Sequence, residues 1–345
     1  MREYLRPLVE LTLARLREQF RQPEMVFWVF AFPILLAVAL GLAFRNRPPD
    51  VVHIAVEASA SADSLAARLE AEGGFAVSVL PTDVASERLR TGRVALVVVP
   101  GDSLGYRYDP NRSESRLARL AADDALQRAL GRRDARPSVD RVVTERGARY
   151  IDFLIPGLLG LNLMGTGMWG MGYAVVDARR RKLMKRLVAS PMRRSQYLLS
   201  LIAARLVLLG PEVAALVGFG TLVFGVPMRG SIASLALATA IGAMCFAGIG
   251  LLTACRAQTV EAASGLMNLI QMPMWVLSGV FFSAANFPAA MQPFIAALPL
   301  TALNDMLRGV MIDGASLLSL AGPLGICVAW GAVSFAVALR LFRWL

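Results

Sequence analysis

The sequence predicts an α-helical polytopic membrane protein with about six transmembrane helices and a small extracytoplasmic α/β domain between spans 1 and 2. Two observations support this fold class. The chain is 56% hydrophobic and only 18% charged, with a mean hydropathy of +0.54, which is too apolar for an ordinary soluble domain. Its apolar residues also gather in runs of about twenty or more, long enough to cross a bilayer, and residues 45–149 are the main polar stretch between them.

The formal net charge of +11 raises the possibility of nucleic-acid binding, so the position of the basic residues matters. Between Arg45 and Arg149 there are 17 basic and 15 acidic residues, and this stretch is nearly neutral. The excess positive charge therefore flanks the apolar runs, as expected at a cytoplasmic membrane surface. This pattern excludes a nucleic-acid partner.

Residues 1–24 are predicted to form an amphipathic helix on the cytoplasmic membrane surface. Apolar residues such as Leu5 and Leu16 recur at roughly helical spacing among arginines. Residues 25–44 carry no charge and form the first predicted span, in which Pro33 is expected to kink the helix. A cleaved signal peptide is the alternative, but the long preceding region contains acidic residues, which favours a retained span.

Residues 45–149 alternate strand-like and helix-like segments, which predicts a small α/β domain with a mostly parallel sheet. His53 begins the first strand, and a strand-edge histidine is favoured over a catalytic or metal-binding one because no partner residues accompany it. No catalytic motif is found here. The expected strands are 51–57, 75–80, 94–100 and 106–108, and the expected helices are 61–72, 82–91 and 113–130.

Residues 150–345 are predicted to form a five-helix permease domain. The loop 177–196 is rich in arginine and lysine, whereas the alternate loops have almost none, so this loop is predicted to be cytoplasmic. With six spans, both termini are then cytoplasmic and residues 45–149 are extracytoplasmic. The expected spans lie near 151–176, 197–225, 232–254, 264–282 and 317–341.

The cysteines, the glycine spacing and the missing phosphate loop indicate no catalytic, metal or nucleotide site on this chain. Cys245, Cys255 and Cys327 lie in or beside apolar segments and suggest no disulfide framework or metal site. The Gly-x-Gly-x-x-Gly spacing of residues 165–170 falls inside a span, so its glycines indicate helix packing or a dimer seam instead of a nucleotide site. The phosphate-loop motif is absent from the sequence, so the chain is not expected to bind ATP or to be an enzyme.

Polar residues inside the predicted spans are candidates for a transport pathway. Glu212 lies near the middle of the third span, where an ionised carboxylate is costly, and Arg205 is seven residues earlier on the same face. A structural ion pair, a protonated glutamate bonded to a neighbouring helix, and a proton or substrate site all remain open. Asn162, Asn268 and Gln271 are expected to be buried polar residues.

The segment 177–191 reads as a short amphipathic helix that ends near Pro191. A plain anchor on anionic membrane lipid explains it equally well. However, the run from Lys185 to Pro191 resembles the Lys/Arg-Leu-x-x-Ser/Thr-Pro element of ABC-2 type transporter permeases. Two later stretches, Met274–Phe282 and Leu298–Arg308, are similar to other parts of that family, in its drug-efflux-like subgroup with a large outer domain.

This resemblance implies that residues 177–191 contact a cytoplasmic ABC ATPase, that ATP and Mg bind only to that partner, and that two permease copies form the pathway. It implies short outer helices that dip back toward the membrane at Leu298–Arg308 and leaves room for a periplasmic adaptor protein. The ATPase-coupling residues would be Asp177, Arg179, Lys182, Lys185, Arg186, Leu187, Ser190 and Pro191.

The expected function is that of a permease subunit of an ATP-driven exporter in a bacterial inner membrane, moving an amphipathic or lipophilic compound or lipid outward. The alternative is a non-transporting sensor or mechanotransmission protein that relays signals from its outer domain. Such a protein would usually carry a cytoplasmic output domain. A one-plus-three-span machine has too few late spans, and a membrane enzyme lacks a supporting motif.

Overall fold

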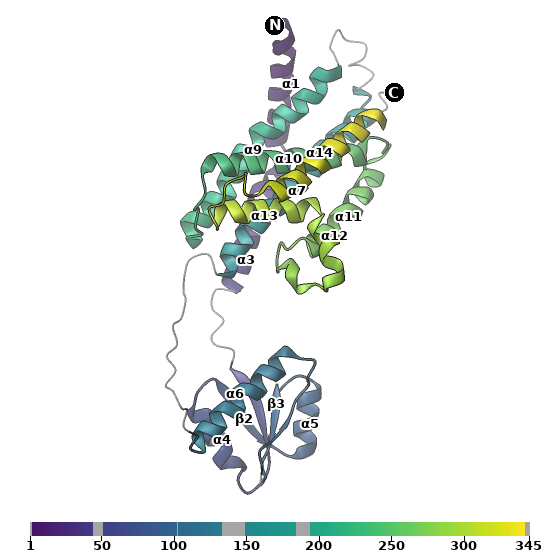
Figure 1. Cartoon of the computed structure of the whole chain (residues 1–345). Helices are drawn as coiled ribbons and strands as arrows, with labels where there is room; N and C mark the ends of the chain where they lie inside the picture. The colour runs from purple at the N-terminus through teal and green to yellow at the C-terminus, as the bar shows by residue number, and fades with distance from the viewer. Residues whose placement is uncertain (1, 44–50, 102, 133–148, 184–193, 342–345) are drawn as a thin grey trace. The chain divides into compact units, whose positions relative to one another are not determined.

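The computed structural model describes all residues except 1, 44–50, 102, 133–148, 184–193 and 342–345. The chain divides into two compact units, one formed by Met1–Arg45 with Thr144–Leu345 and the other by Asn46–Val143. The first unit is mostly helical and is called the membrane unit, and the second is called the α/β unit (Figure 1). Each unit has its own hydrophobic core.

The α/β unit contains a four-stranded sheet in the order β2-β1-β3-β4, in which β1 pairs in parallel with β2 and β3, and β4 runs antiparallel to β3. Side chains alternate across the sheet, so Ile54 and Val56 face the helices α4 and α6 while Ala55 faces α5. The predicted α/β domain is therefore confirmed. Its elements are β1 Val52–Glu57, α4 Ala62–Ala71, β2 Phe75–Leu80, α5 Thr82–Arg90, β3 Leu96–Val99, β4 Gly105–Arg107 and α6 Ser113–Ala129.

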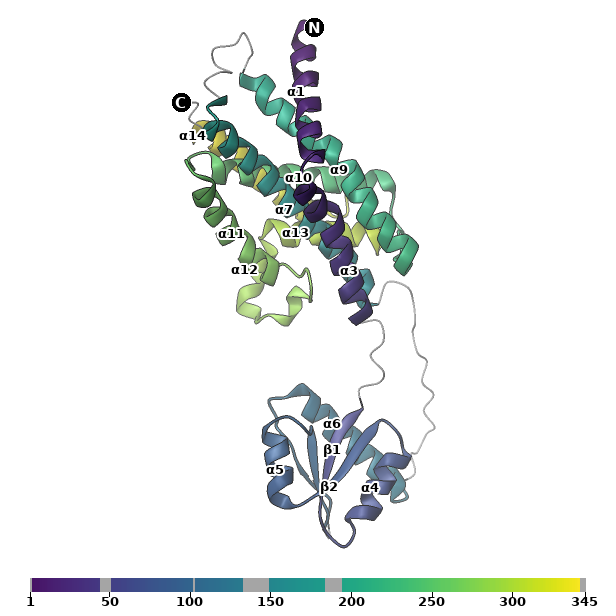
Figure 2. The ribbon, with the colours of Figure 1, turned by 180° about the vertical axis from the view of Figure 1, so that it is seen from behind.

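The membrane unit is built around one long central helix, α7, which packs against α3, α9, α10, α11 and α13. Helix α1 lies beside α9 in both views (Figure 1, Figure 2). The elements are α1 Arg2–Phe20, α2 Pro23–Val26, the π-helical turn η1 Phe27–Ala31, α3 Phe32–Ala43, α7 Tyr150–Arg180, α9 Arg194–Phe224, α10 Ile232–Ala254, α11 Val260–Leu277, the 3-10 turns η2 Ala284–Asn286 and η3 Ala289–Met291, α12 Gln292–Ala296, α13 Pro299–Met311 and α14 Ala321–Leu341.

Five helices of the described chain are long and apolar enough to cross a membrane, and a pair bent by 82° would make a sixth. The pair joins Ala289–Ala296 to Pro299–Met311, in the region predicted to hold short helices that dip back toward the membrane. The predicted span 264–282 differs from the structure in its bounds, because α11 ends at Leu277, shortly before Gly279 with φ of +68°. Helix α11 is also not among the five candidate spans, since Glu261, Asn268 and Gln271 lower its hydropathy. The last span begins at Ala321 instead of Leu317.

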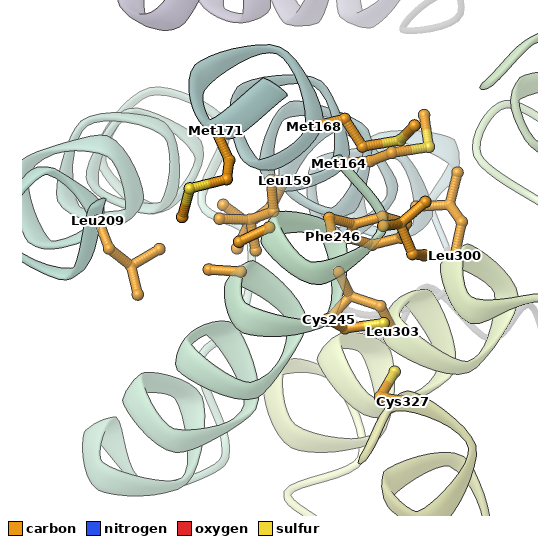
Figure 3. Close-up of a cluster of buried hydrophobic side chains, with 14 of the residues drawn as sticks. Leu159, Met164, Met168, Met171, Leu209, Cys245, Phe246, Leu300, Leu303 and Cys327 are labelled. Atoms are coloured by element: carbon orange, nitrogen blue, oxygen red, sulfur yellow. The ribbon is translucent and has the colours of Figure 1, made fainter. Parts of the chain in front are cut away.

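The core of the membrane unit lies where α7, α10, α13 and α14 meet. Figure 3 shows Met164 and Met168 of α7 beside Phe246 of α10 and Leu300 of α13, all fully buried. Helix α13 is also fixed by polar contacts, because the Asn304 amide donates to the Ser278 carbonyl at 2.9 Å. These contacts hold the turn after α11 against the bundle.

Four glycines of α7 allow the close approach of its neighbours. A Cβ at Gly167 would lie 2.8 Å from Phe246 Cβ, and one at Gly157 would lie 2.6 Å from the Val280 carbonyl oxygen. Gly160 and Gly172 are similarly crowded by α13 and by α10 with α11. In contrast, Gly165 and Gly170 have open space beside them. The glycine surface is therefore used for packing within the chain at four positions.

Candidate functional site

A cavity of about 750 Å³ lies in the membrane unit between α1, the first span, α7, α9 and the end of α11. Its walls are mainly apolar and include Trp28, Trp169 and Trp275. The open faces of Gly165 and Gly170 form part of the wall, because the absence of side chains there leaves space. A roomy apolar cavity with a few polar groups is typical of a site for an amphipathic small molecule.

Arg205 and Glu212 form a buried ion pair on α9 beside this cavity. Arg205 Nη1 donates to Glu212 Oε2 at 2.5 Å, and the two residues are only 7% and 1% exposed. Thr166 of α7 donates its hydroxyl to Glu212 Oε1 at 2.9 Å and also lies 2.8 Å from the Asn162 carbonyl. Both carboxylate oxygens therefore have partners, and Glu212 links α9 to α7.

Asn162 connects α7 to the first span at a break in its helical hydrogen bonding. Pro33 has no N–H to donate to the Val29 carbonyl four residues earlier, and the chain forms a π-helical turn at Phe27–Ala31. The Asn162 amide donates to the Val29 carbonyl at 3.0 Å. Pro33 thus leaves the Val29 carbonyl without its usual helical donor, and Asn162 of α7 supplies a donor from another helix.

Gln271 and Asn268 lie on α11 and differ in their exposure. Gln271 is buried, and its Oε1 accepts a hydrogen bond from Trp169 Nε1 at 3.1 Å. Asn268 is exposed, contrary to the prediction that it is buried. The reason is helical geometry, because Met267, Gln271 and Met274 form the stripe that faces the bundle and Asn268 lies about 100° away from it.

Charged residues form a rim at the end of the cavity away from Glu212, and they pair with one another. Arg15 lies 3.5 Å from Glu18 and donates to the Tyr197 hydroxyl at 2.9 Å, while Arg181 lies 2.9 Å from Asp177. The hydrogen bond to Asp177 raises the pKa of Arg181, which keeps this guanidinium charged. The cavity thus extends from a neutralised charged rim to the Arg205–Glu212 pair.

The predicted ATPase-coupling residues divide into three groups. Arg179 points into the bundle, where it donates to the carbonyls of Ala254, Cys255 and Ala257 at 3.3, 3.0 and 2.6 Å. Asp177 binds Arg181, and Lys182 is exposed with φ of +56°. The remaining residues lie outside the described part of the chain: Lys185, Arg186, Leu187, Ser190 and Pro191.

A family model of ABC-2 family transporter proteins matches residues 23–340, which covers both units and all of the cavity except its α1 rim and Gln22. The chain belongs to the ABC-2 transporter family. A curated relative is the linearmycin resistance permease protein LnrN of Bacillus subtilis (strain 168), which is 23% identical over 94% of this chain and 96% of the relative. The predicted resemblance is confirmed, and the chain is an integral membrane subunit of a transporter.

In this ABC-2 transporter subunit, Arg179 acts as a C-terminal cap of α10, because its guanidinium satisfies carbonyls that the helix leaves unpaired. Replacing Arg179 by alanine is expected to cost about 2 kcal/mol of stability, the range for hydrogen bonds to a charged group. Thermal unfolding followed by size-exclusion chromatography would measure this loss. Arg180→Ala, at the exposed neighbouring position, serves as the control, and equal losses in both variants would contradict the capping role.

Sequence reasoning missed Thr166 and the cavity tryptophans of this ABC-2 transporter subunit. Thr166 had a weak signal, because it lies four residues after Asn162 on the same face of one helix. Trp28 and Trp169 are far apart in the sequence and share a cavity only because α7 packs against the first span. No local pattern indicates that pairing.

Proposed function

We propose that this chain is the membrane permease subunit of an ATP-binding-cassette exporter. It moves an amphipathic or lipophilic compound or lipid out of the cytoplasm or the inner leaflet, and a separate ATPase subunit supplies the energy. The chain resides in a bacterial inner membrane with six spans, cytoplasmic termini and residues 45–149 outside. The basic loop 177–196 supports this orientation, since positive residues concentrate on the cytoplasmic side.

The cavity carries the proposal. Its apolar walls suit the body of a lipophilic compound, and the ion pair with Thr166 gives it a polar centre. It extends to the rim at Asp177 and Arg181, which belong to the segment 177–191 proposed to contact the ATPase. A movement of that loop would therefore act directly on one end of the cavity. The resistance role in the name of the Bacillus relative supports export in particular.

A second permease copy is part of the proposal. Helix α11 presents an apolar outer face, with Leu269 70% and Met272 62% exposed, and Asn268 lies among these residues. A carboxamide facing lipid alone would lack hydrogen-bond partners, whereas a second helix can supply them. This supports an α11 interface with either an identical or a related copy.

Purification of the tagged chain with its native membrane partners tests the proposal. We expect mass spectrometry to identify an ABC ATPase in the complex and the complex to show vanadate-sensitive ATP hydrolysis. A pure oligomer without ATPase would favour the sensor or mechanotransmission alternative.

The coupling loop is tested in the same assay with Arg186→Ala/Leu187→Ala. This variant is expected to lose most of the associated ATPase, because the loop would no longer offer its basic and apolar contacts. Arg340→Ala, in the last turn of α14, removes an arginine elsewhere on the proposed cytoplasmic side and should retain the ATPase. Normal ATPase association in the double variant would contradict the assignment of residues 177–191 as the coupling element.

A further inference from the structure

Arg205 has hydrogen-bonding capacity that the protein does not use. Its Nη1 donates to Glu212, but its Nε and Nη2 are buried and have no hydrogen-bond partner among the described residues. These two nitrogens form one edge of the guanidinium, and their N–H groups are parallel. That edge matches the two oxygens of a carboxylate or phosphate.

Buried donors without partners are costly, so an acceptor is expected to bind there in some state of the protein. Arg205 lines the cavity, whereas Glu212 lies behind it and has both oxygens occupied. The charged residues at the rim bind one another instead. Asp177 lies eleven residues after Thr166 on α7, which is about 16 Å along the helix axis. Among the described lining residues, Arg205 is therefore the cation that lies away from the charged rim.

We propose that Arg205 binds the acidic head group of an amphipathic molecule, a carboxylate or a phosphate, while the apolar part of that molecule occupies the tryptophan-lined cavity. Binding requires the guanidinium to turn its Nε–Nη2 edge toward the cavity that the residue already lines. The Glu212 contact through Nη1 keeps the charge in place during this turn. This inference rests on the proposed permease function and names its substrate class.

Native mass spectrometry of the full chain in neutral detergent tests the inference with oleate, oleyl phosphate, oleyl alcohol and oleylamine as probes. The four probes share one apolar chain and differ only in the head group. We expect oleate or oleyl phosphate to bind at least about tenfold more tightly than oleyl alcohol, since a charge-assisted bidentate contact has that effect. A preference for oleyl phosphate indicates a phospholipid head group, and a preference for oleate indicates another acidic amphiphile.

The variant Arg205→Gln/Glu212→Gln should lose this preference, because it removes the guanidinium without leaving an unpaired charge. Arg205→Lys keeps the charge beside Glu212 but lacks the second edge, and it should lose the preference as well. If the double variant does not fold, Arg205→Lys alone tests whether the preference depends on the guanidinium. Arg340→Gln, an exposed change on α14 outside the cavity lining, is the matched control and should keep the preference.

Equal binding of oleate, oleyl phosphate and oleyl alcohol, tighter binding of oleylamine, or an acid preference that survives both Arg205 variants would overturn the inference. None of these results affects association with an ATPase, so the permease function would still stand. Conversely, an acid preference that depends on Arg205 in a chain that recruits no ATPase would support the site and contradict the exporter.

Discussion

Replacing Glu212 by alanine is expected to destabilise the membrane unit by about 3–5 kcal/mol, because it leaves the guanidinium of Arg205 buried without its counter-charge. The Thr166 hydroxyl would also lose the carboxylate that joins α7 to α9. The apparent Tm, measured by fluorescence-detected size-exclusion chromatography after heating, should fall by about 10 °C.

The variant Arg205→Met/Glu212→Met separates stability from function. Replacing both members of a buried pair by apolar residues of similar size is often nearly neutral for stability, so the double variant should recover most of the lost Tm. Its transport should stay defective if the pair serves the pathway. If Glu212→Ala melts at the wild-type temperature, the pair does not hold α9 in the bundle.

Replacing Gly250 by valine is expected to disrupt the crossing of α7 and α10. A Cβ at Gly250 would lie 2.5 Å from the Met168 carbonyl oxygen and 2.7 Å from its Cα, and backbone atoms cannot move aside as a flexible side chain can. Overpacking of this kind costs about 1–3 kcal/mol, and contact with backbone places this site at the upper end. We expect a loss of monodisperse protein and a lower apparent Tm.

Gly165→Ala is the matched control for this crossing. It lies on α7, the other helix of the crossing, but a Cβ added there would meet no atom of another described element within 4 Å, so the change should be neutral or should stabilise the helix by up to about 1 kcal/mol. Similar losses at Gly250 and Gly165 would show that the close contact of Gly250 with the Met168 backbone does not control stability at this crossing.

The α/β unit could be predicted almost completely from the sequence. Its strands and helices are short segments bounded by turn residues, and the two-residue period of a strand places Ile54 and Val56 on one face of β1 and Ala55 on the other. The order of the strands needed the structure, because β1 lies between β2 and β3 although it comes first in the chain. Sheet order depends on how the connecting helices cross, which no single segment encodes.

The candidate site was predicted in part. The spacing of Arg205 and Glu212 places them on one face of one helix, but the sequence left open whether they pair, and the structure shows the ion pair. Gln271 and Asn268 look equivalent in sequence, yet only Gln271 faces α7. Arg179 belongs to a basic run typical of a cytoplasmic loop, but it caps α10 because the ends of α7 and α10 meet.

The sequence by itself determined the membrane class and the inserted α/β domain, because each depends on hydropathy or periodicity within one segment. It also identified the family, through a resemblance that extends over most of the chain. Only the tertiary structure decided which glycines are packed, which carbonyl Asn162 satisfies and where the cavity lies. These features arise where helices distant in sequence meet, and their geometry is set by the packing of whole helix faces.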